Sequence, residues 1–290
     1  MKQKKGWVNY HTHTQFCDGQ ADPIRYMEAA IKSGLLHLGF SAHAPVPFEN
    51  EWSIKNTDMP LYCRHIRQLS DTFHDDIRVF LALEADFIPE VSTDFDLFKQ
   101  EYDLDYVIGG IHLIKRRGKD GLWFIDGPGQ NYDLGLEKVF NNDIRMAVGH
   151  FFDQSREMVN TQKFDIIAHF DKITMNNSGR FFTTEEKWYQ RHLLNLVQDL
   201  ANKQIIVEVN TRGKYKKRSS GFFPDLNALE LCKRYKVPVT ISTDAHLPEE
   251  IDLLIEEAAE MLYEIGFREL AVFSGKKWEL KSFTPEGIIF

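Results

Sequence analysis

Short apolar runs alternate with amphipathic segments along most of the chain. Apolar runs of this length, rich in β-branched and aromatic residues, favour β-strands. Two runs near the end of the sequence, 269–273 and 277–283, predict short strands. The main expected strands cover 7–13, 38–45, 78–87, 105–114, 164–171, 204–213 and 237–246.

The segments between these runs place apolar residues at helical spacing. Pro23 fits the first turn of a helix, and Gly34 fits its C-terminal cap. A long, mostly helical segment is expected before residue 164. The other expected helices cover 23–34, 61–73, 183–203, 225–235 and 249–266.

Strands that alternate with helices are typical of a parallel sheet covered by helices. For 290 residues without repeats or linkers, this pattern predicts one α/β domain over residues 1–290 that closes into a TIM-like barrel. An open, doubly wound sheet is the alternative fold.

Composition narrows the class of protein. Asp and Glu number 43 against 35 Lys and Arg, a net charge of −8, which disfavours non-specific nucleic-acid binding. Three scattered cysteines form no C-x-x-C pair and favour a reducing compartment. No stretch resembles a signal peptide or a membrane span. We therefore expect a cytoplasmic protein that binds neither membranes nor nucleic acid.

Potential metal ligands follow the predicted strands. In α/β barrels, the carboxyl ends of the strands build the active site. Six of the seven main strands deliver a histidine or carboxylate to that end, and the sixth strand ends instead in Asn210 and Arg212. The ligand types at these ends are His11, His13, His43, Glu84, His112, His169, Asp244 and His246.

Two of these strand ends carry ligand pairs at two-residue spacing. Side chains at i and i+2 of a strand point the same way, so His11 and His13 are expected to reach one ion, as are Asp244 and His246. Asp18 follows on the loop after the first strand, close enough to fold back over this end. Any one of these residues alone could have an ordinary structural role, and only their coincidence predicts a metal site.

The ligand set also indicates which metals would bind. Imidazole and carboxylate without thiolate suit Zn²⁺, Mn²⁺ or Fe better than Mg²⁺ or Ca²⁺. Nine candidates exceed the three protein ligands of a typical catalytic zinc, so two or three ions are expected. Clustered ions of this kind activate water and bind phosphoryl oxygens.

The stretches HTHTQFCDG, FSAHAP, LEADF, IGGIHLI, IIAHFD and STDAH, in this order, resemble the motifs of the PHP (polymerase and histidinol phosphatase) superfamily. The likeness runs from about residue 7 to about residue 275. DYVIGGIHLI and EVNTRG are most similar to the histidinol-phosphate phosphatase branch. The resemblance implies a distorted (β/α)7 barrel with a trinuclear metal centre. Carried over by motif, its ligands are the eight strand-end residues above and Asp18, with Glu84 as the bridging carboxylate.

The resemblance further implies hydrolysis of L-histidinol phosphate to L-histidinol and phosphate in histidine biosynthesis, by attack of a metal-bound hydroxide. Another phosphoesterase of the superfamily, acting on nucleotides or phosphotyrosine, is the nearest alternative. A non-catalytic metal-binding domain and a proofreading nuclease module are further alternatives, which the free-standing length and acidic balance disfavour.

A basic loop follows the sixth strand, with five cations between residues 212 and 218. Most such runs are solvated surface charges. This loop leaves the same end of the barrel as the expected metal ligands, which favours a contact with substrate phosphate. Arg212 is the first candidate and Lys216 the second.

Overall fold

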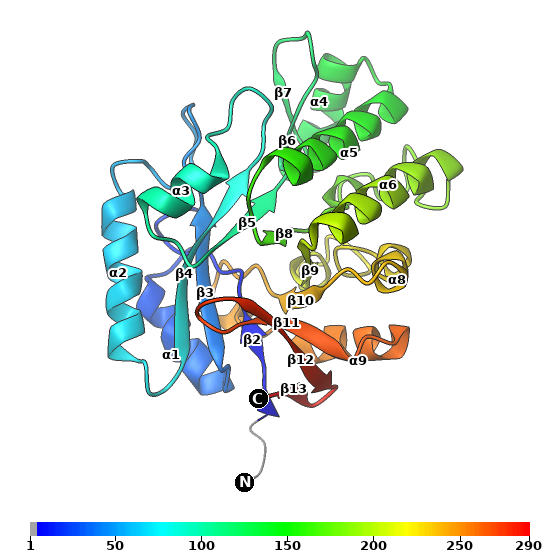
Figure 1. The fold of residues 1–290 in the computed structure, drawn as a ribbon. Coiled ribbons are helices and arrows are strands. Elements are labelled where there is room, and N and C mark those ends of the chain that lie inside the picture. The colour runs from blue at the N-terminus through cyan, green and yellow to red at the C-terminus, as the bar shows by residue number, and fades with distance from the viewer. Residues whose placement is uncertain (1–4) are drawn as a thin grey trace.

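Seven parallel strands form the centre of the computed structural model, which describes residues 5–290 (Figure 1). Each strand pairs with the next barrel strand along the chain, in the order β10-β9-β8-β5-β4-β3-β2. All seven expected main strands are confirmed, although most are shorter than predicted. They are β2 (Val8–Asn9), β3 (His37–His43), β4 (Arg78–Asp86), β5 (Tyr106–Gly110), β8 (Ile166–Ile167), β9 (Ile206–Asn210) and β10 (Val239–Ser242).

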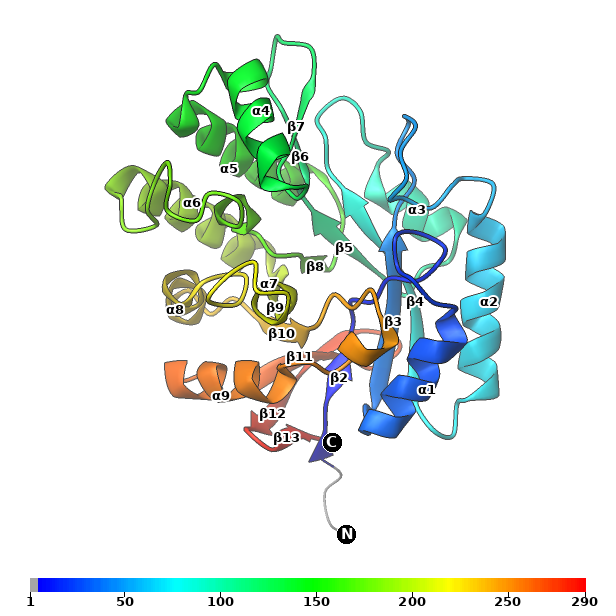
Figure 2. The same cartoon turned by 180° about the vertical axis from the view of Figure 1, so that it is seen from behind.

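Helices surround these strands on the outside (Figures 1 and 2). The first helix has the predicted ends: Asp22 caps it by accepting a hydrogen bond from the Ile24 N–H, and Gly34 ends it with φ of 79°. The α-helices are α1 (Pro23–Ser33), α2 (Met59–Thr72), α3 (Phe95–Glu101), α4 (Gly129–Phe140), α5 (Ile144–Thr161), α6 (Lys187–Lys203), α7 (Arg212–Tyr215), α8 (Leu226–Arg234) and α9 (Ile255–Ile265). Two short 3₁₀ turns are η1 (Lys172–Thr174) and η2 (Pro248–Glu250). Within residues 5–290, no helix combines the length and apolar character needed to cross a lipid bilayer.

The barrel is nearly closed where its first and last strands meet. Beyond the ends of β2 and β10, Thr12 and Ala245 form a parallel bridge. The His13 N–H donates to the Ala245 carbonyl at 2.8 Å. Inside this seam, the Asn9 side-chain amide donates to the Thr243 hydroxyl at 2.8 Å. These contacts support the predicted barrel over the open-sheet alternative.

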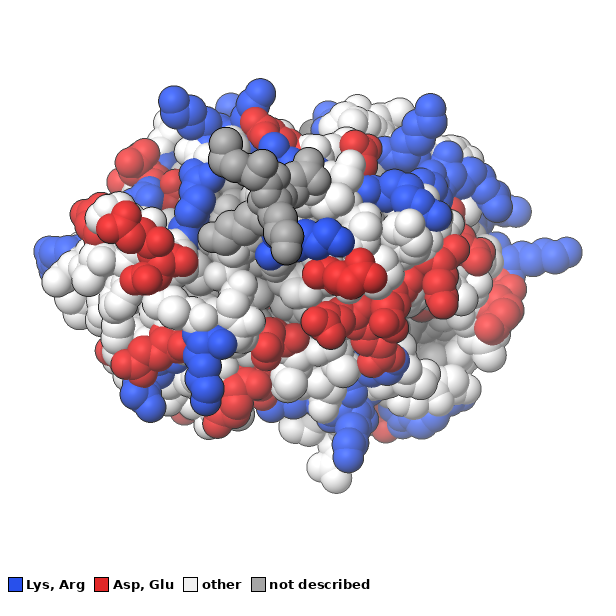
Figure 3. Space-filling model, turned by 90° about the horizontal axis from the view of Figure 1, so that it is seen from below, with Lys and Arg blue, Asp and Glu red and all other residues white. Residues whose placement is uncertain are grey.

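A second, antiparallel sheet covers the amino-terminal end of the barrel. Its order is β1 (Lys5–Gly6), β13 (Gly287–Ile289), β12 (Trp278–Thr284) and β11 (Glu269–Phe273), and it contains both short strands predicted near the end of the sequence. Figure 3 views the molecule from this side, where acidic and basic side chains are interspersed.

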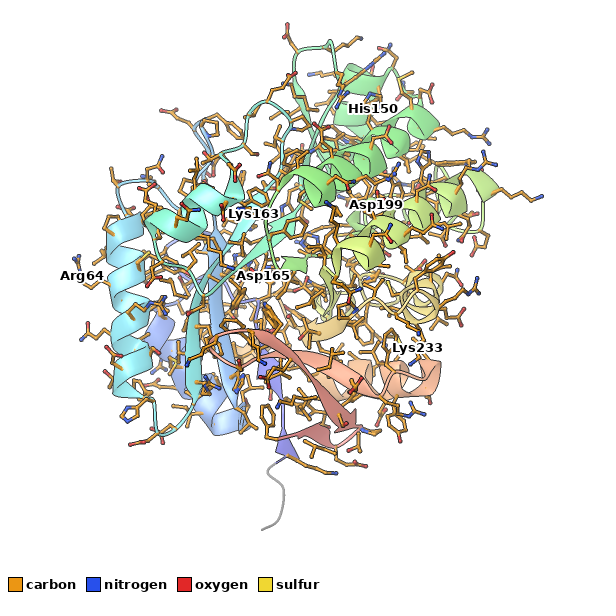
Figure 4. All side chains as sticks on the ribbon, viewed as in Figure 1. Arg64, His150, Lys163, Asp165, Asp199 and Lys233 are labelled. Carbon is orange, nitrogen blue, oxygen red and sulfur yellow. The ribbon has the colours of Figure 1, made fainter. Side chains whose placement is uncertain are left out.

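Aromatic rings join this second sheet to the barrel; we call them, with Asp165, the floor. The Trp278 ring lies 5.1 Å from the ring of Tyr10 and 5.5 Å from that of Tyr106. Trp278 also donates from its indole N–H to Asp165, which lies at the start of β8 near the centre of Figure 4. Phe273 packs against the rings of Tyr106 and Trp278.

The fold differs most from the sequence prediction in the segment before residue 164. The segment before residue 164 was expected to be mostly helical, but its first part is the hairpin of β6 (Leu113–Lys115) and β7 (Leu122–Phe124). Gly118 and Gly121 have φ of 73° and 96° in its turn, a conformation that disfavours a helix. The prediction was wrong here because the helical pattern of α4 and α5 was extended over this turn.

Candidate metal centre

The bridge that closes the barrel also aligns the two ligand pairs. Thr12 and Ala245 are paired, so the residues on either side of each face one another across the seam. His13 Nε2 lies 3.4 Å from Asp244 Oδ1, and the rings of His13 and His246 lie 4.1 Å apart. The two-residue spacing therefore directs all four side chains to one place.

Glu84 lies at the centre of this group. The register of β3 and β4 pairs His43 with Glu84, and the Glu84 side chain is 1 % exposed. No other described carboxylate is approached by as many histidines. Its two oxygens lie within 3.7 Å of nitrogen atoms from His11, His13, His43, His112 and His169.

Three overlapping sets of side chains have ligand atoms within 4.8 Å of one another. Glu84 belongs to two of them, as do His13 and His43, and shared ligands are what neighbouring ions require. The sets are His13, Asp18, His43 and His246; His11, His13 and Glu84; and His43, Glu84 and His112. Predicted ligands outside these sets are close by, because His169 contacts Glu84 and Asp244 contacts His13. The structure thus brings all nine predicted residues together.

Local backbone features hold the edges of this cluster in place. A Cβ atom at Gly19 would lie 2.4 Å from the Thr14 backbone nitrogen, so only glycine lets the loop with Asp18 fold back this closely. His169 and Asp244 have φ of 25° and 54°, which is unfavourable for side chains with a Cβ atom. Strain of this kind is concentrated at functional sites.

Two carboxylates outside the cluster orient its histidines, and the sequence analysis missed both. The His11 Nδ1–H donates to Glu208 at 2.6 Å, and the His112 Nδ1–H donates to Asp86 at 2.8 Å. In each case Nε2 is left to face the cluster, the arrangement typical of metal-binding histidines. Glu208 stands two residues before Asn210 and Asp86 two residues after Glu84, so the same i, i+2 spacing was an available signal.

The charges of the cluster depend strongly on one another. Burial favours the neutral form of His11, but Glu208, Glu84 and Asp244 outweigh it and raise its pKa well above the usual range. Burial would also lower the pKa of His112, yet Asp86 and Glu84 together raise it to about 9. For Glu84, burial alone would raise the pKa, and His11, His43 and His112 lower it well below the usual range.

This donor set fits divalent transition metals. The Nε2 atoms of His11 and His13 lie 3.0 Å apart, so two lone pairs face each other unless a cation or proton intervenes. Nδ1 of His169 is buried and has no hydrogen-bond partner in the described chain. Buried polar atoms are rarely left in this state without an ion, water or ligand.

Next to the cluster is a cavity of about 200 Å³. Six of the nine predicted metal ligands line it: Asp18, His43, Glu84, His112, Asp244 and His246. Three cations, Lys172, Arg212 and Arg218, form another part of its wall. Its remaining lining residues, Phe124 and Asp126, come from the end of the β6–β7 hairpin.

The cations of this wall are held by ion pairs. Lys172 Nζ lies 2.7 Å from Asp126, and Arg218 lies 3.6 Å from the same carboxylate. Burial would lower the pKa of Lys172, but Asp126, Asp244 and Glu84 together outweigh it and raise the pKa. Arg212 lies 3.2 Å from Glu250 and donates to the Asp244 carbonyl at 2.9 Å. Dianionic phosphate is a suitable ligand for such a wall.

The two residues predicted to bind phosphate differ in their position relative to the cavity. Both pair with Glu250, but Arg212 lines the cavity, whereas Lys216 is not among its described lining residues. Lys172, Arg218, Phe124 and Asp126 were not selected from the sequence. Lys172 follows His169 by three residues, but nothing local distinguishes it from a surface lysine.

Comparison with known proteins places this geometry in a family. The sequence matches the PHP domain profile over residues 9–212. The histidinol-phosphatase of Lactococcus lactis is 26% identical over 277 residues, which cover 93% of this chain and 95% of the relative. The histidinol-phosphatase of Bacillus subtilis is 25% identical over 272 residues, covering 86% of this chain and 97% of the relative.

Solved structures share the fold. A candidate histidinol phosphatase from Listeria monocytogenes superposes with a TM-score of 0.75 at 17% identity, covering 85% of this chain and 97% of the other. The Lactococcus lactis histidinol phosphate phosphatase, crystallised with zinc, L-histidinol and phosphate, gives a TM-score of 0.67 at 23% identity, covering 94% and 98%. These likenesses confirm the predicted barrel.

Proposed function

The chain belongs to the PHP domain family, and from this premise we propose that it hydrolyses L-histidinol phosphate to L-histidinol and phosphate. It is then a metal-dependent phosphoric monoester hydrolase of histidine biosynthesis. Curated relatives named histidinol-phosphatase align with nearly the whole chain, which supports this activity over nucleotide or phosphotyrosine hydrolysis. The Lactococcus lactis protein binds zinc, L-histidinol and phosphate, the same classes of ligand that we propose here.

One observation carries the proposal: a single small cavity borders both a cluster of nine potential metal ligands and three cations. Either feature alone would also suit a different role, because histidine clusters store metals and basic walls bind many anions. Together they suit a phosphate monoester, whose phosphoryl group carries about two negative charges at neutral pH. The cavity's volume of about 200 Å³ is suited to a small molecule.

Two or three divalent ions, Zn²⁺, Mn²⁺ or Fe, would be held by the nine predicted ligands. When bound, such ions lower the pKa of water and neutralise phosphoryl oxygens. Glu84 would be shared between ions, because it belongs to two of the three sets. Glu208 and Asp86 keep His11 and His112 in the tautomer that presents Nε2 to the cluster.

The cation wall would hold the substrate's phosphate. Lys172 is buried and kept charged by Asp126, and Arg212 is fixed beside Asp244 by its bond to the backbone. Charged donors fixed in advance stabilise the charge that develops on phosphoryl oxygens without reorganising during the reaction. One phosphorus–oxygen bond forms to water while the ester phosphorus–oxygen bond breaks, and the alcohol leaves with a proton.

We further propose that the enzyme acts in the cytoplasm as a single barrel domain and has no nucleic-acid partner. The three cysteines are free thiols, which suits a reducing compartment. Fractionation of cells that express the tagged protein at native level checks the location. Recovery with membranes or outside the cell would contradict it.

The experiment that tests the activity is a phosphate-release panel on the metal-loaded enzyme. Its substrates are L-histidinol phosphate, AMP, phosphotyrosine and a short single-stranded DNA. We expect kcat/KM for L-histidinol phosphate to exceed the others by at least about a hundredfold. The matched control is the same enzyme after chelation and again after metal is restored. Equal or faster release from AMP or phosphotyrosine would favour the alternative phosphoesterase instead.

A further inference from the structure

The β6–β7 hairpin contributes two side chains to the cavity: Asp126, which also pairs with Lys172, and Phe124, which the proposed chemistry does not use. Phe124 is the last residue of β7, and Asp126 follows it by two positions. Both line the cavity. The other nine lining residues are potential metal ligands and cations, which suit the phosphoryl group. The alcohol half of a phosphate ester must therefore meet the hairpin or leave the cavity.

One carboxylate oxygen of Asp126 is available to accept a hydrogen bond. Its Oδ2 is paired with Lys172 at 2.7 Å, but its buried Oδ1 accepts no hydrogen bond. The nearest cation to Oδ1 is Arg218, at 3.6 Å, and half of the Arg218 side chain is exposed. A carboxylate oxygen without a donor is unfavourable, and an ammonium group on a ligand would supply donors.

The hairpin holds its ring and its carboxylate close together. A Cβ atom at Gly127 would lie 3.0 Å from the Phe124 ring, so glycine lets the chain that carries Asp126 turn back against this ring. The Phe124 side chain is partly exposed, and its neighbour Trp123 is fully buried. An aromatic ring and an anion thus form one part of the cavity wall, whereas the three cations form another.

We infer that this hairpin selects the alcohol half of the substrate, with Asp126 pairing with an ammonium group near the ester and Phe124 packing against an aromatic ring. The class of substrate is then a phosphate ester of an aromatic amino alcohol. The inference rests on the proposed function and deepens it, because L-histidinol phosphate carries both an imidazole ring and an ammonium group.

The test compares two substrates that differ only in the amino group: L-histidinol phosphate and 3-(imidazol-4-yl)propyl phosphate. Asp126→Asn should lower kcat/KM for L-histidinol phosphate about ten- to a hundredfold, the value of a hydrogen bond to a charged group. For the analogue without the amino group, the loss should be at least about fivefold smaller, because only the change in the Lys172 pair is common to both substrates. Asp120→Asn, in the exposed turn of the same hairpin, is the matched control and should behave as wild type.

Binding and metal content separate this role from others. L-Histidinol should bind to Asp126→Asn about tenfold or more weakly in calorimetry, while the metal content per chain stays unchanged. Loss of metal would identify Asp126 as a ligand, and equal losses with both substrates would assign it to the phosphate end. Either result, like an Asp126→Asn enzyme with wild-type kinetics, overturns the inference.

The ring contact has its own test. Phe124→Leu should lower kcat/KM for L-histidinol phosphate several-fold and leave the value for phosphoethanolamine, which has the ammonium group but no ring, within about twofold. The wild-type enzyme also decides between the two proposals. If it hydrolyses L-histidinol phosphate and its analogue without the amino group equally well, the function stands and the inference is wrong. If it hydrolyses neither, the proposed function fails.

Discussion

At the amino-terminal end of the barrel, the buried polar groups of the floor have partners within the chain. The Tyr106 hydroxyl donates to the Tyr10 carbonyl at 2.6 Å, and the Tyr10 hydroxyl accepts from the Phe273 N–H at 2.9 Å. Asp165 accepts hydrogen bonds from Lys99, Val107 and Trp278. At the carboxyl-terminal end, by contrast, histidine nitrogens face one another and Glu84 is surrounded by imidazoles.

The difference is also visible in the unpaired atoms. Eight buried side-chain atoms in the described chain lack a hydrogen-bond partner. Four belong to the cluster or touch it, on His43, Asp86, Asp126 and His169, and none belongs to the floor. The floor is thus arranged for stability, whereas the carboxyl-terminal end keeps unpaired groups ready for ligands. Substitutions at the two ends should therefore have separable effects.

The largest expected effect is at Glu84. Glu84→Gln keeps the size of the side chain but removes the charge that several histidines share. We expect turnover to fall at least about a thousandfold, equivalent to about 4 kcal/mol, because metal is lost and the remaining site is misarranged. Metal analysis and phosphate release measure both. Glu90→Gln, an exposed neighbour on the same segment, is the control. Near-normal turnover in Glu84→Gln would make Glu84 a structural residue.

Phe273→Ala tests the opposite end. Removing a buried ring that packs against Phe80, Tyr106 and Trp278 should lower the free energy of unfolding by about 3 kcal/mol. Turnover of the folded, metal-loaded enzyme should stay within about twofold, because the floor does not touch the cavity. Urea unfolding and steady-state kinetics check these outcomes. Phe181→Ala, at an exposed ring, is the control. A large loss of turnover without loss of stability would refute the division between the two ends.

Arg212→Ala tests phosphate binding at the carboxyl-terminal end separately from metal binding. Loss of a charged phosphate contact should lower kcat/KM by about 2 kcal/mol, roughly thirtyfold, with metal content unchanged. Lys216→Ala should have less effect, since Lys216 does not line the cavity, although both side chains pair with Glu250. Lys217→Ala, on the exposed part of the same loop, is the control. Wild-type kinetics in both Arg212→Ala and Lys216→Ala would show that the cations of this loop make no contact with the substrate phosphate.

The pH dependence of the metal-free protein gives the smallest effect. The pKa of His112 is about 9 in the fold, above its usual value near 6.5, so protonation of His112 stabilises the fold. This stability is fully present below about pH 6.5 and is lost as pH rises through about 9. Between pH 6 and pH 8, we expect a loss of about 1–2 kcal/mol that Asp86→Asn removes and bound metal suppresses. Urea unfolding at both pH values, with and without chelator, measures it. If the free energy of unfolding of Asp86→Asn fell between pH 6 and pH 8 as much as that of the wild type, this account would be contradicted.

The sequence predicted the barrel and the nine cluster residues because both follow from local rules. The carboxyl ends of the strands meet at one end of a barrel, and residues at i and i+2 share a face. The sequence alone therefore predicts that His11, His13, Asp244 and His246 lie together. Glu84 was found in the same way. The predictions fail where a role is decided by pairing across the fold.

Lys172 and Asp126 show why. They are 46 positions apart, and only the tertiary structure makes them a buried ion pair at the cavity. Glu208 acts through the ring of His11 and is not itself among the strand-end ligands, so a search for such ligands does not select it, even though it lies two residues before Asn210. Lys216 illustrates the reverse case: its position in the sequence favours a role at the metal centre, but its side chain turns to Glu250. As a phosphate contact, Lys216 stays a prediction.

The seam that closes the barrel also sets an order of events during synthesis. Asn9 and Thr243 bond across it although 234 positions separate them. At about 5–20 residues per second, β2 waits roughly ten seconds or longer on the ribosome before its partner exists. His11 and His13 therefore face no Asp244 or His246 for most of translation. Complete metal loading becomes a late event in the life of the nascent chain, one that only a chain with nearly the whole barrel made can undergo.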